Sequence, residues 1–114
     1  MHMNTEDIRL YCLKKDLVTE GFPFGDSTLV FKWGAKIFAL LFLDDPQINL
    51  KCDPEKAIEL REQYAAVLPG YHMNKLHWNT VILDGSIPPG LLKEWIDHSY
   101  ELVSGRKRKK TVKG

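Results

Sequence analysis

Two runs of β-forming residues, 28–33 and 36–43, are separated by only a Gly-Ala pair at 34–35. Such a pair is typical of a type II′ hairpin turn, because glycine supplies the positive φ that the first turn position requires. A third run, 48–52, follows a turn sequence and alternates apolar with polar residues, which directs Asn49 outward. These three runs predict an antiparallel meander and limit the chain to folds built on an antiparallel sheet.

Helix signals flank these strands. A helix over 5–15 carries two acidic residues in its first turn, where carboxylates favour the positive end of the helix dipole. Asp53-Pro54 begins a second helix, since aspartate is a good N-cap and proline is favoured at the first helical position. The proline pair 88–89 opens a third helix, whose apolar residues recur with the helical period until Gly105 ends it.

Two further strands, 71–73 and 77–83, are expected to form a second hairpin around a tight connection at 74–76. The segment 20–26 is expected to be a loop, because glycine and proline interrupt any regular period, and its two phenylalanines are expected to pack against the core. The predicted order is helix, three strands, helix, two strands, helix. That order predicts an α+β two-layer sandwich, with an antiparallel sheet and the helices on one face.

The formal net charge of +1 conceals an uneven distribution of charge. Residues 106–114 contain six lysines and arginines and no acid, so residues 1–105 hold ten basic against 15 acidic residues, a net charge of −5. The chain has 114 residues, of which 44% are hydrophobic and 27% charged, as in a soluble single domain. We expect one domain over residues 4–105, a flexible basic tail over 106–114, and an alternative start or an expression remnant in residues 1–3.

Signals for membrane insertion and secretion are not found in the sequence. The longest apolar run, 37–43, has seven residues, far fewer than the roughly 20 needed to cross a bilayer. Two cysteines, Cys12 and Cys52, occur without a signal peptide or a CxxC motif, which favours reduced thiols. We therefore expect a cytoplasmic protein that binds no membrane.

The patterns of common catalytic and metal sites are also missing from the sequence. His72 and His77 could approach each other across a hairpin, but no third ligand follows at a recognised spacing. No GxSxG motif occurs, and no glycine-rich loop lies between a strand and a helix, where a phosphate loop would lie. An enzymatic function would need a deep pocket with perturbed ionisable groups around these histidines. We expect neither an enzyme nor a protein with a metal ion or another cofactor.

The segment 71–79 combines cationic, amide and aromatic side chains, and two interpretations of it remain open. It is suited to nucleic acid, since lysine binds phosphate, asparagine matches an adenine edge and aromatic rings stack on bases. The alternative is a structural hairpin, fixed by hydrogen bonds of the Asn74 side chain, with Trp78 packed on the sheet. Residue types alone favour the structural alternative.

The tail carries the clearest electrostatic signal in the chain. Flexible basic arms bind phosphate backbones without sequence preference, because the bound cations release counterions. A solvated terminus that only aids solubility is an equally good interpretation, since charge alone identifies no partner. The adjacent cations are Arg106, Lys107, Arg108, Lys109 and Lys110.

Several motifs give the chain a resemblance to a known family. The run PGYHMNKLHWNTV at 69–81 is long and unusual, and LDGSIP follows it at 83–88. Shorter stretches precede it: FPF at 22–24, VFK at 30–32, FAL at 38–40, NLK at 49–51 and DP at 53–54. Together they make residues 20–103 resemble the MmcQ/YjbR family of small bacterial proteins.

That resemblance implies a fold similar to type III secretion chaperones, with the order of elements given above. It also implies a double wing, in which two hairpins at 33–36 and 74–77 project from one sheet and contact DNA. The hypothesis is a DNA-binding protein whose tail adds non-specific phosphate affinity. The alternative is a protein- or peptide-binding module without a nucleic-acid function, built around an exposed patch near Trp33 or Trp78. The expected DNA contacts outside the tail are Lys32, Trp33, Lys36, His72, Asn74, Lys75, His77 and Trp78.

Overall fold

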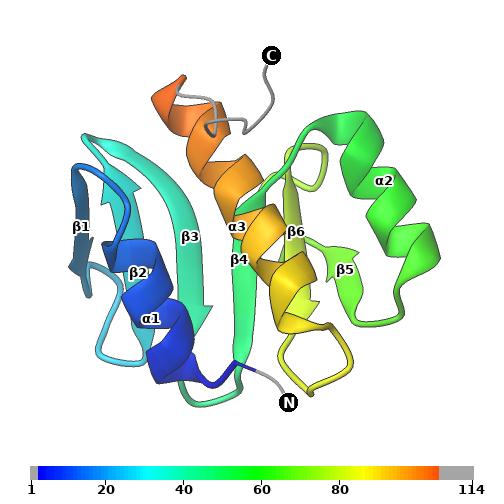
Figure 1. Ribbon diagram of the computed structural model, residues 1–114, viewed down its shortest axis with the longest axis horizontal. Coiled ribbons are helices and arrows are strands. Elements are labelled where there is room, and N and C mark those ends of the chain that lie inside the picture. Colours follow the sequence, from blue (N-terminus) through cyan, green and yellow to red (C-terminus); the bar gives the residue numbers. More distant parts are fainter. Residues whose placement is uncertain (1–2, 106–114) are drawn as a thin grey trace.

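The computed structural model describes residues 3–105. It contains an antiparallel sheet of six strands in the order β1-β2-β3-β4-β6-β5, and three helices lie on one face of this sheet (Figure 1). Within these residues the other face carries no helix, and it is called the open face below. The strands are β1 (Val18–Gly21), β2 (Thr28–Trp33), β3 (Lys36–Phe42), β4 (Gln47–Lys51), β5 (Val67–Pro69) and β6 (Trp78–Ile82). The helices are α1 (Thr5–Leu13), α2 (Pro54–Gln63) and α3 (Pro89–Ser104).

The α+β sandwich predicted from the sequence is confirmed, and so is its first hairpin. Trp33 pairs with Lys36 across the two-residue turn, in which Gly34 has a φ of +61° and Ala35 has no positive φ. Helix α3 ends where predicted, at Gly105, whose φ of +71° places it in the left-handed region that glycine tolerates best. Local turn and cap chemistry was therefore sufficient to place these boundaries.

Strand β1 is an element that the sequence analysis did not predict. Residues 20 and 21, expected in a loop, belong to this strand, which pairs with β2 from Val18↔Trp33 to Gly21↔Val30. The expectation that the two following phenylalanines pack against the core is wrong, since Phe22 is 50% and Phe24 is 65% exposed. Both lie in the connection from β1 to β2, and neither belongs to the buried core cluster.

The predicted strand at 71–73 is also wrong. Strand β5 ends at Pro69, and residues 70–77 form an irregular connection to β6. The ladder stops because the Tyr71 N–H donates to Thr80 Oγ1 (2.8 Å) and Asn49 Nδ2 donates to the Tyr71 carbonyl (2.8 Å). Side chains thus take the backbone groups that a strand would pair.

Asn49 was predicted to point outward, and it does lie on the open face, but its exposed fraction is 0%. The 70–77 connection covers it, and the hydrogen bond from Asn49 Nδ2 to the Tyr71 carbonyl satisfies the buried amide. Period-two alternation correctly predicted the face of the sheet, whereas burial depended on a segment 22 residues further along the chain.

The main core lies between the sheet and the helices. Phe31, Phe38, Ile48 and Ile96 are fully buried there. Ser99 on α3 is also fully buried, and its hydroxyl donates to the Phe38 carbonyl and accepts from the Lys51 N–H (2.9 Å). These bonds hold α3 across the middle of the sheet, where it contacts β2, β3 and β4 (Figure 1).

A second polar contact joins α1 to α3. The ammonium of Lys15 pairs with the buried carboxylate of Asp97, which also accepts a hydrogen bond from the Tyr11 hydroxyl at 2.7 Å. Lys15 lies over the Tyr11 and Tyr100 rings as well, at 4.9 and 5.2 Å from their centroids. Because its charge is compensated inside the fold, Lys15 is not a surface cation available to a partner.

Candidate nucleic-acid interface

The sheet has two ends, which are distinguished by the connections between its strands. The hairpin end contains the β2–β3 turn (34–35), the β4–α2 connection (52–53) and the β5–β6 connection (70–77). Antiparallel pairing of β3 with β4 and of β4 with β6 brings these three connections to the same end. The acidic end contains the connections 22–27, 43–46 and 83–88.

The connections at the two ends differ in charge. Those at the acidic end contain no lysine, arginine or histidine, and they contain four aspartates: Asp26, Asp44, Asp45 and Asp84. At the hairpin end, the 70–77 connection contains no acid and holds Lys75 with two histidines. Lys51 and Lys56 flank the β4–α2 connection, where Asp53 and Glu55 partly balance them. The net negative charge of the body is thus unevenly placed, and the predicted contact residues within 3–105 lie away from the aspartate-rich connections.

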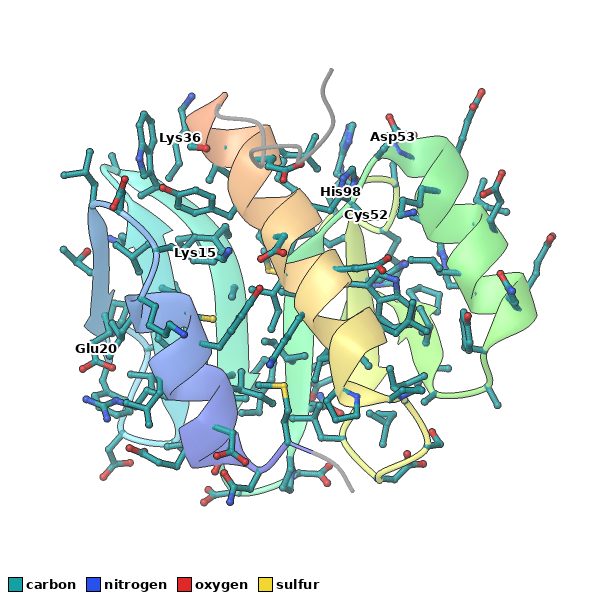
Figure 2. All side chains as sticks on the ribbon, viewed as in Figure 1. Lys15, Glu20, Lys36, Cys52, Asp53 and His98 are labelled. Atoms are coloured by element: carbon teal, nitrogen blue, oxygen red, sulfur yellow. The ribbon has the colours of Figure 1, made fainter. Side chains whose placement is uncertain are left out.

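The first hairpin carries Lys36 at its tip, and Lys36 forms no ion pair with another residue of the range 3–105. Lys36 is exposed and lies at the outer end of β3 (Figure 2), whereas Lys32 and Trp33 are half-buried. The Trp33 ring packs against the helix-side core, and its Nε1 is buried without a hydrogen-bond partner among the described residues. Trp33 is therefore mainly a packing residue, with little ring surface for stacking.

The second connection is held in place by its own side chains. Asn74 Oδ1 accepts from the N–H groups of Leu76 (2.9 Å) and His77 (3.2 Å), as in an Asx turn. The Lys75 ammonium donates to the Gly70 carbonyl at 2.9 Å, and Arg61 on α2 donates to the Lys75 carbonyl at 3.2 Å. Among the predicted contacts in this connection, His72, Asn74, Lys75 and His77 are all exposed.

Trp78 is placed differently from the other predicted contacts. It is 8% exposed and packs with Val30 and Leu40 on the open face of the sheet. Gly70 lies directly against it, because a Cβ on Gly70 would come within 2.7 Å of the Trp78 Cβ and 2.9 Å of its carbonyl oxygen. Trp78 therefore supports the 70–77 connection by packing against Gly70, and little of its ring area is exposed.

The predicted contacts in the tail, residues 106–110, lie outside the described residues. The described chain ends at Gly105, at the same end of the sheet as the two hairpin connections (Figure 1). Contacts of the last turns of α3 agree with this placement, since the Asp53 N–H donates to His98 Nε2 at 3.2 Å. Gly105, the residue that precedes the basic segment in the sequence, thus lies at the hairpin end.

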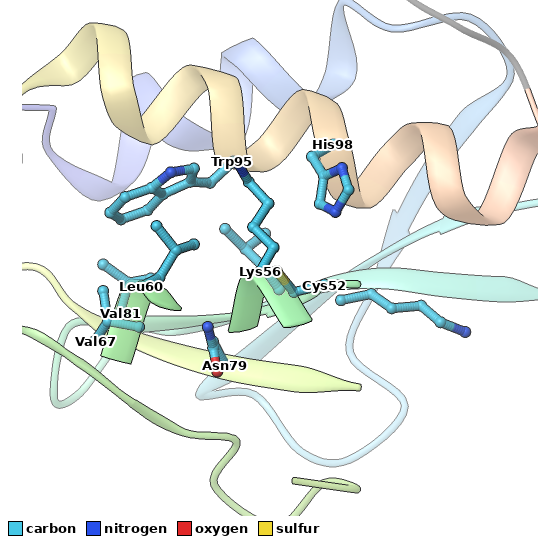
Figure 3. A pocket seen from close by; sticks show the side chains of 10 residues that line it. Cys52, Lys56, Leu60, Val67, Asn79, Val81, Trp95 and His98 are labelled. Atoms are coloured by element: carbon cyan, nitrogen blue, oxygen red, sulfur yellow. The ribbon is translucent and has the colours of Figure 1, made fainter. Parts of the chain in front are cut away.

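A small cavity lies between α2, α3 and the sheet near this end (Figure 3). Cys52, Lys56, Asn79, Trp95 and His98 are among its lining residues, and its volume of about 10 Å³ is that of a single water. Burial raises the pKa of the Cys52 thiol to about 11, which keeps it protonated and unreactive near neutral pH. Burial lowers the pKa of His98, and the nearby Lys56 ammonium adds to that effect.

Within residues 3–105, no group of three or more histidine, cysteine, aspartate or glutamate side chains is arranged to hold a metal ion. No helix of that region has the length and apolar character needed to span a membrane. His72 and His77 do not line the small cavity, which is instead next to His98. The contact of His98 could not be predicted from the sequence, because its partner, the Asp53 N–H, lies 45 residues away in the chain.

Comparison with known proteins identifies the family. The YjbR family profile matches residues 13–102. The chain belongs to the YjbR family. Among its relatives, YbdF of Escherichia coli O157:H7 is 40% identical over 100 residues, covering 86% of this chain and 82% of YbdF. YjbR of Escherichia coli strain K12 is 33% identical over 123 residues, covering 96% of this chain and 98% of YjbR.

Solved structures show the same YjbR fold. The crystal structure of protein DR2400 of Deinococcus radiodurans, a DUF419 domain, is 41% identical in sequence with a TM-score of 0.86, covering 96% of this chain and 84% of that chain. A crystal structure from Pseudomonas syringae is 29% identical with a TM-score of 0.78, covering 89% and 99%. YbdF and YjbR are themselves uncharacterized proteins, so family membership assigns no function to this chain.

Proposed function

We propose that this YjbR protein binds double-stranded DNA, with the hairpin end of its sheet facing the phosphate backbone. The observation that supports the proposal is the uneven charge of the two ends, with four aspartates in the connections of one end and lysines around the hairpins of the other. A body of net charge −5 is repelled by DNA on average. Its uneven charge distribution nevertheless orients it in the field of the duplex, so that the hairpin end approaches first.

The two strands that border β4 have a spacing that suits a DNA groove. β3 and β6 both neighbour β4, and adjacent strands lie about 4.8 Å apart, so the ends of β3 and β6 are separated by about 10 Å. The major groove of B-DNA is about 12 Å wide. In the proposed complex, Lys36 at the start of β3 and Lys75 in the 70–77 connection contact phosphates on either side of one groove.

Lys75 must exchange its acceptor to make this contact. Its ammonium donates to the neutral Gly70 carbonyl in the free protein, and a phosphate oxygen is a stronger, charged acceptor. Asn74 keeps its side-chain oxygen in the turn, and its amide nitrogen remains as a donor toward DNA. In this complex the exposed polar groups contact DNA, and Trp33 and Trp78 contribute only by packing within the protein.

The test is fluorescence anisotropy with a short labelled duplex at about 50 mM and about 200 mM salt. Lys36→Gln and Lys75→Gln should each weaken binding by about three- to tenfold at the lower salt, because each loses one phosphate contact. The matched control is Lys93→Gln on α3, which makes the same change of charge on the helix-covered face and should bind like the parent. Absence of binding by the full chain at low salt would reject the proposal, and so would equal weakening by the control.

The tail is tested in the same assay. Removing residues 106–114 should flatten the dependence of log K on log salt by up to about five units, near −0.9 for each phosphate neutralised. If the shortened chain keeps the salt slope of the full chain, the tail takes no part in binding. The hairpin contribution is then judged from the lysine variants alone.

A protein- or peptide-binding module was the alternative expected from the sequence, with a patch at Trp33 or Trp78. Trp33 is half-buried and Trp78 is 8% exposed, so neither offers a large aromatic surface. Capture of partners from a lysate before and after nuclease treatment separates the two functions. Partners that disappear with nuclease support DNA binding, and partners that persist support the module.

A further inference from the structure

The open face of the sheet contains a cavity of about 400 Å³ near the acidic end. Its volume lies within the usual range for sites that bind small ligands. It lies between the β3–β4 turn and strand β5, on the side of the sheet that the helices leave uncovered. Its lining residues are Ser27, Phe42, Asp44, Asp45, Gln47, Leu68, Pro69, Tyr71 and Thr80.

One wall of this cavity is held by buried hydrogen bonds. Tyr71 is 50% exposed, yet two buried side chains fix its backbone: Thr80 accepts from its N–H, and Asn49 donates to its carbonyl. Thr80 Oγ1 in turn donates to Asn49 Oδ1, so the two side chains satisfy each other. The Tyr71 ring stands edge-on to Phe42, with 6.1 Å between the centroids. A surface aromatic ring is thus set in a defined position, as binding sites require.

The rim of the cavity carries negative charge without compensation. Asp44 and Asp45 are exposed, and neither forms an ion pair with a lysine or arginine among residues 3–105. Among residues 3–105, no lysine, arginine or histidine lines the cavity, and none occurs in the adjacent connections 22–27 and 43–46. In the third adjacent connection, the His72 ring lies 3.9 Å from the Tyr71 ring, measured between centroids, but His72 is not a lining residue. Carboxylates beside aromatic rings attract organic cations, through charge and through the negative faces of the rings.

We propose that this cavity binds an alkylguanidinium or alkylammonium group, with the cation between Asp44 and Asp45 and the alkyl arm along Phe42, Leu68 and Tyr71. Arginine and lysine side chains of a peptide carry this group, and so do free aliphatic amines. The site shares the 70–77 connection with the proposed DNA interface, because Tyr71 forms one wall of the cavity. Its test uses a small cation and no DNA, so failure of this proposal is distinguishable from failure of DNA binding.

The test is an NMR titration of the ¹⁵N-labelled full chain with butylguanidinium, and in parallel with butylurea, a neutral analogue of the same shape. Butylguanidinium should cause saturable shifts at the amides of Asp44, Gln47, Tyr71 and Thr80, and butylurea should not. A blocked pentapeptide with a central arginine forms the second arm. Binding of the peptide at least tenfold tighter than the free cation would identify a peptide as the source of the group, and similar affinities would identify a small free cation.

Two variants and one matched control complete the design. The double variant Asp44→Asn/Asp45→Asn should weaken binding by about three- to tenfold, and Tyr71→Ala by about threefold, with its backbone bonds retained. Asp26→Asn removes one charge at the same end from outside the cavity and should leave the affinity unchanged. The proposal is overturned if butylurea binds as well as butylguanidinium, if no saturable shift occurs, or if Asp26→Asn weakens binding as much as the double variant.

Discussion

The hairpin end and the acidic end of this sheet belong to the same strands but differ in how their connections are held. At the hairpin end, the 70–77 connection is fastened by buried Asn49 and Thr80 and by the close contact of Gly70 with Trp78. At the acidic end, the 22–27 connection leaves Phe22 and Phe24 exposed. The net charge of −5 for the body therefore describes the local charge of neither end. The charge that a partner contacts depends on which connections lie at the same end of the sheet.

The largest expected effect concerns the packing that holds the hairpin end. Gly70→Ala should lower the free energy of unfolding by about 2 to 3 kcal/mol, because the new Cβ overlaps the Trp78 backbone and β5 must separate from β6. Urea denaturation measures this change. Gly90→Ala is the matched control, since a Cβ there meets nothing within 4 Å, and its stability should equal or slightly exceed that of the parent. Equal stability of both variants would show that the close contact at Gly70 is not required.

The second prediction compares the stability cost of removing two asparagine side chains that hold the 70–77 connection, buried Asn49 and exposed Asn74. Asn49→Ala should cost about 2 kcal/mol, because the Tyr71 carbonyl and the Thr80 hydroxyl lose their buried partner. Asn74→Ala should cost about 0.5 to 1 kcal/mol, since water can replace an exposed turn acceptor. Hydrogen exchange at the Tyr71 amide should accelerate in the first variant only. If exchange at the Tyr71 amide accelerates equally in both variants, the Asn74 side chain also holds the 70–77 connection against the sheet, contrary to this prediction.

The third effect compares the two ends directly by removing charge from each. Lys36→Gln should weaken DNA binding by about three- to tenfold at low salt. Asp44→Asn/Asp45→Asn should strengthen DNA binding by less than about twofold under the same conditions. The aspartates lie at the far end of the sheet, and screening over about 10 Å removes most of their repulsion. Anisotropy at two salt concentrations distinguishes these effects. A stronger response to the aspartates than to the lysine would mean that DNA meets the acidic end.

The smallest effect is a dependence of stability on pH at His98. Burial lowers the pKa of His98 in the folded protein below its ordinary value of 6.5, so the unfolded chain binds a proton first as pH falls. The contribution of His98 is therefore complete above pH 6.5 and is lost as pH falls through the folded pKa. NMR titration of the ring should give a pKa below 6.5 that rises in Lys56→Gln, because that ammonium disfavours the charged imidazole. An unchanged pKa in this variant would assign the shift to burial alone.

Much of the fold followed from short-range sequence patterns. Gly34 with Ala35 predicted the first hairpin, Asp53-Pro54 predicted the start of α2, and Gly105 predicted the end of α3. Each depends on backbone preferences of residues adjacent in the chain, which the sequence displays directly. Strand β1 and strand β5 were missed because they are short and weakly patterned, and they are strands because β2 and β6 pair with them.

The candidate sites were less predictable than the fold. Lys36, His72, Asn74, Lys75 and His77 were identified from residue types and from the family motif, and all are exposed at the hairpin end. The cavity near Asp44 and Asp45 was not, since its walls come from β3, β4, β5, β6 and three connections. In the sequence these aspartates stand beside Pro46 in a turn, a place where solvated acids are ordinary. Their relation to Tyr71 exists only after the 70–77 connection folds over the sheet.

The sequence alone determined the secondary-structure elements with strong local signals, the separation of the basic residues 106–114 from an acidic body, and the YjbR family. The tertiary structure decided which charges share an end of the sheet, whether Asn49 and Trp78 lie buried or exposed, and where Tyr71 stands. The physical reason is the range of the interactions involved. Turns and caps are set by dihedral preferences of a few neighbouring residues, whereas burial and local charge are sums over segments that only strand pairing brings together.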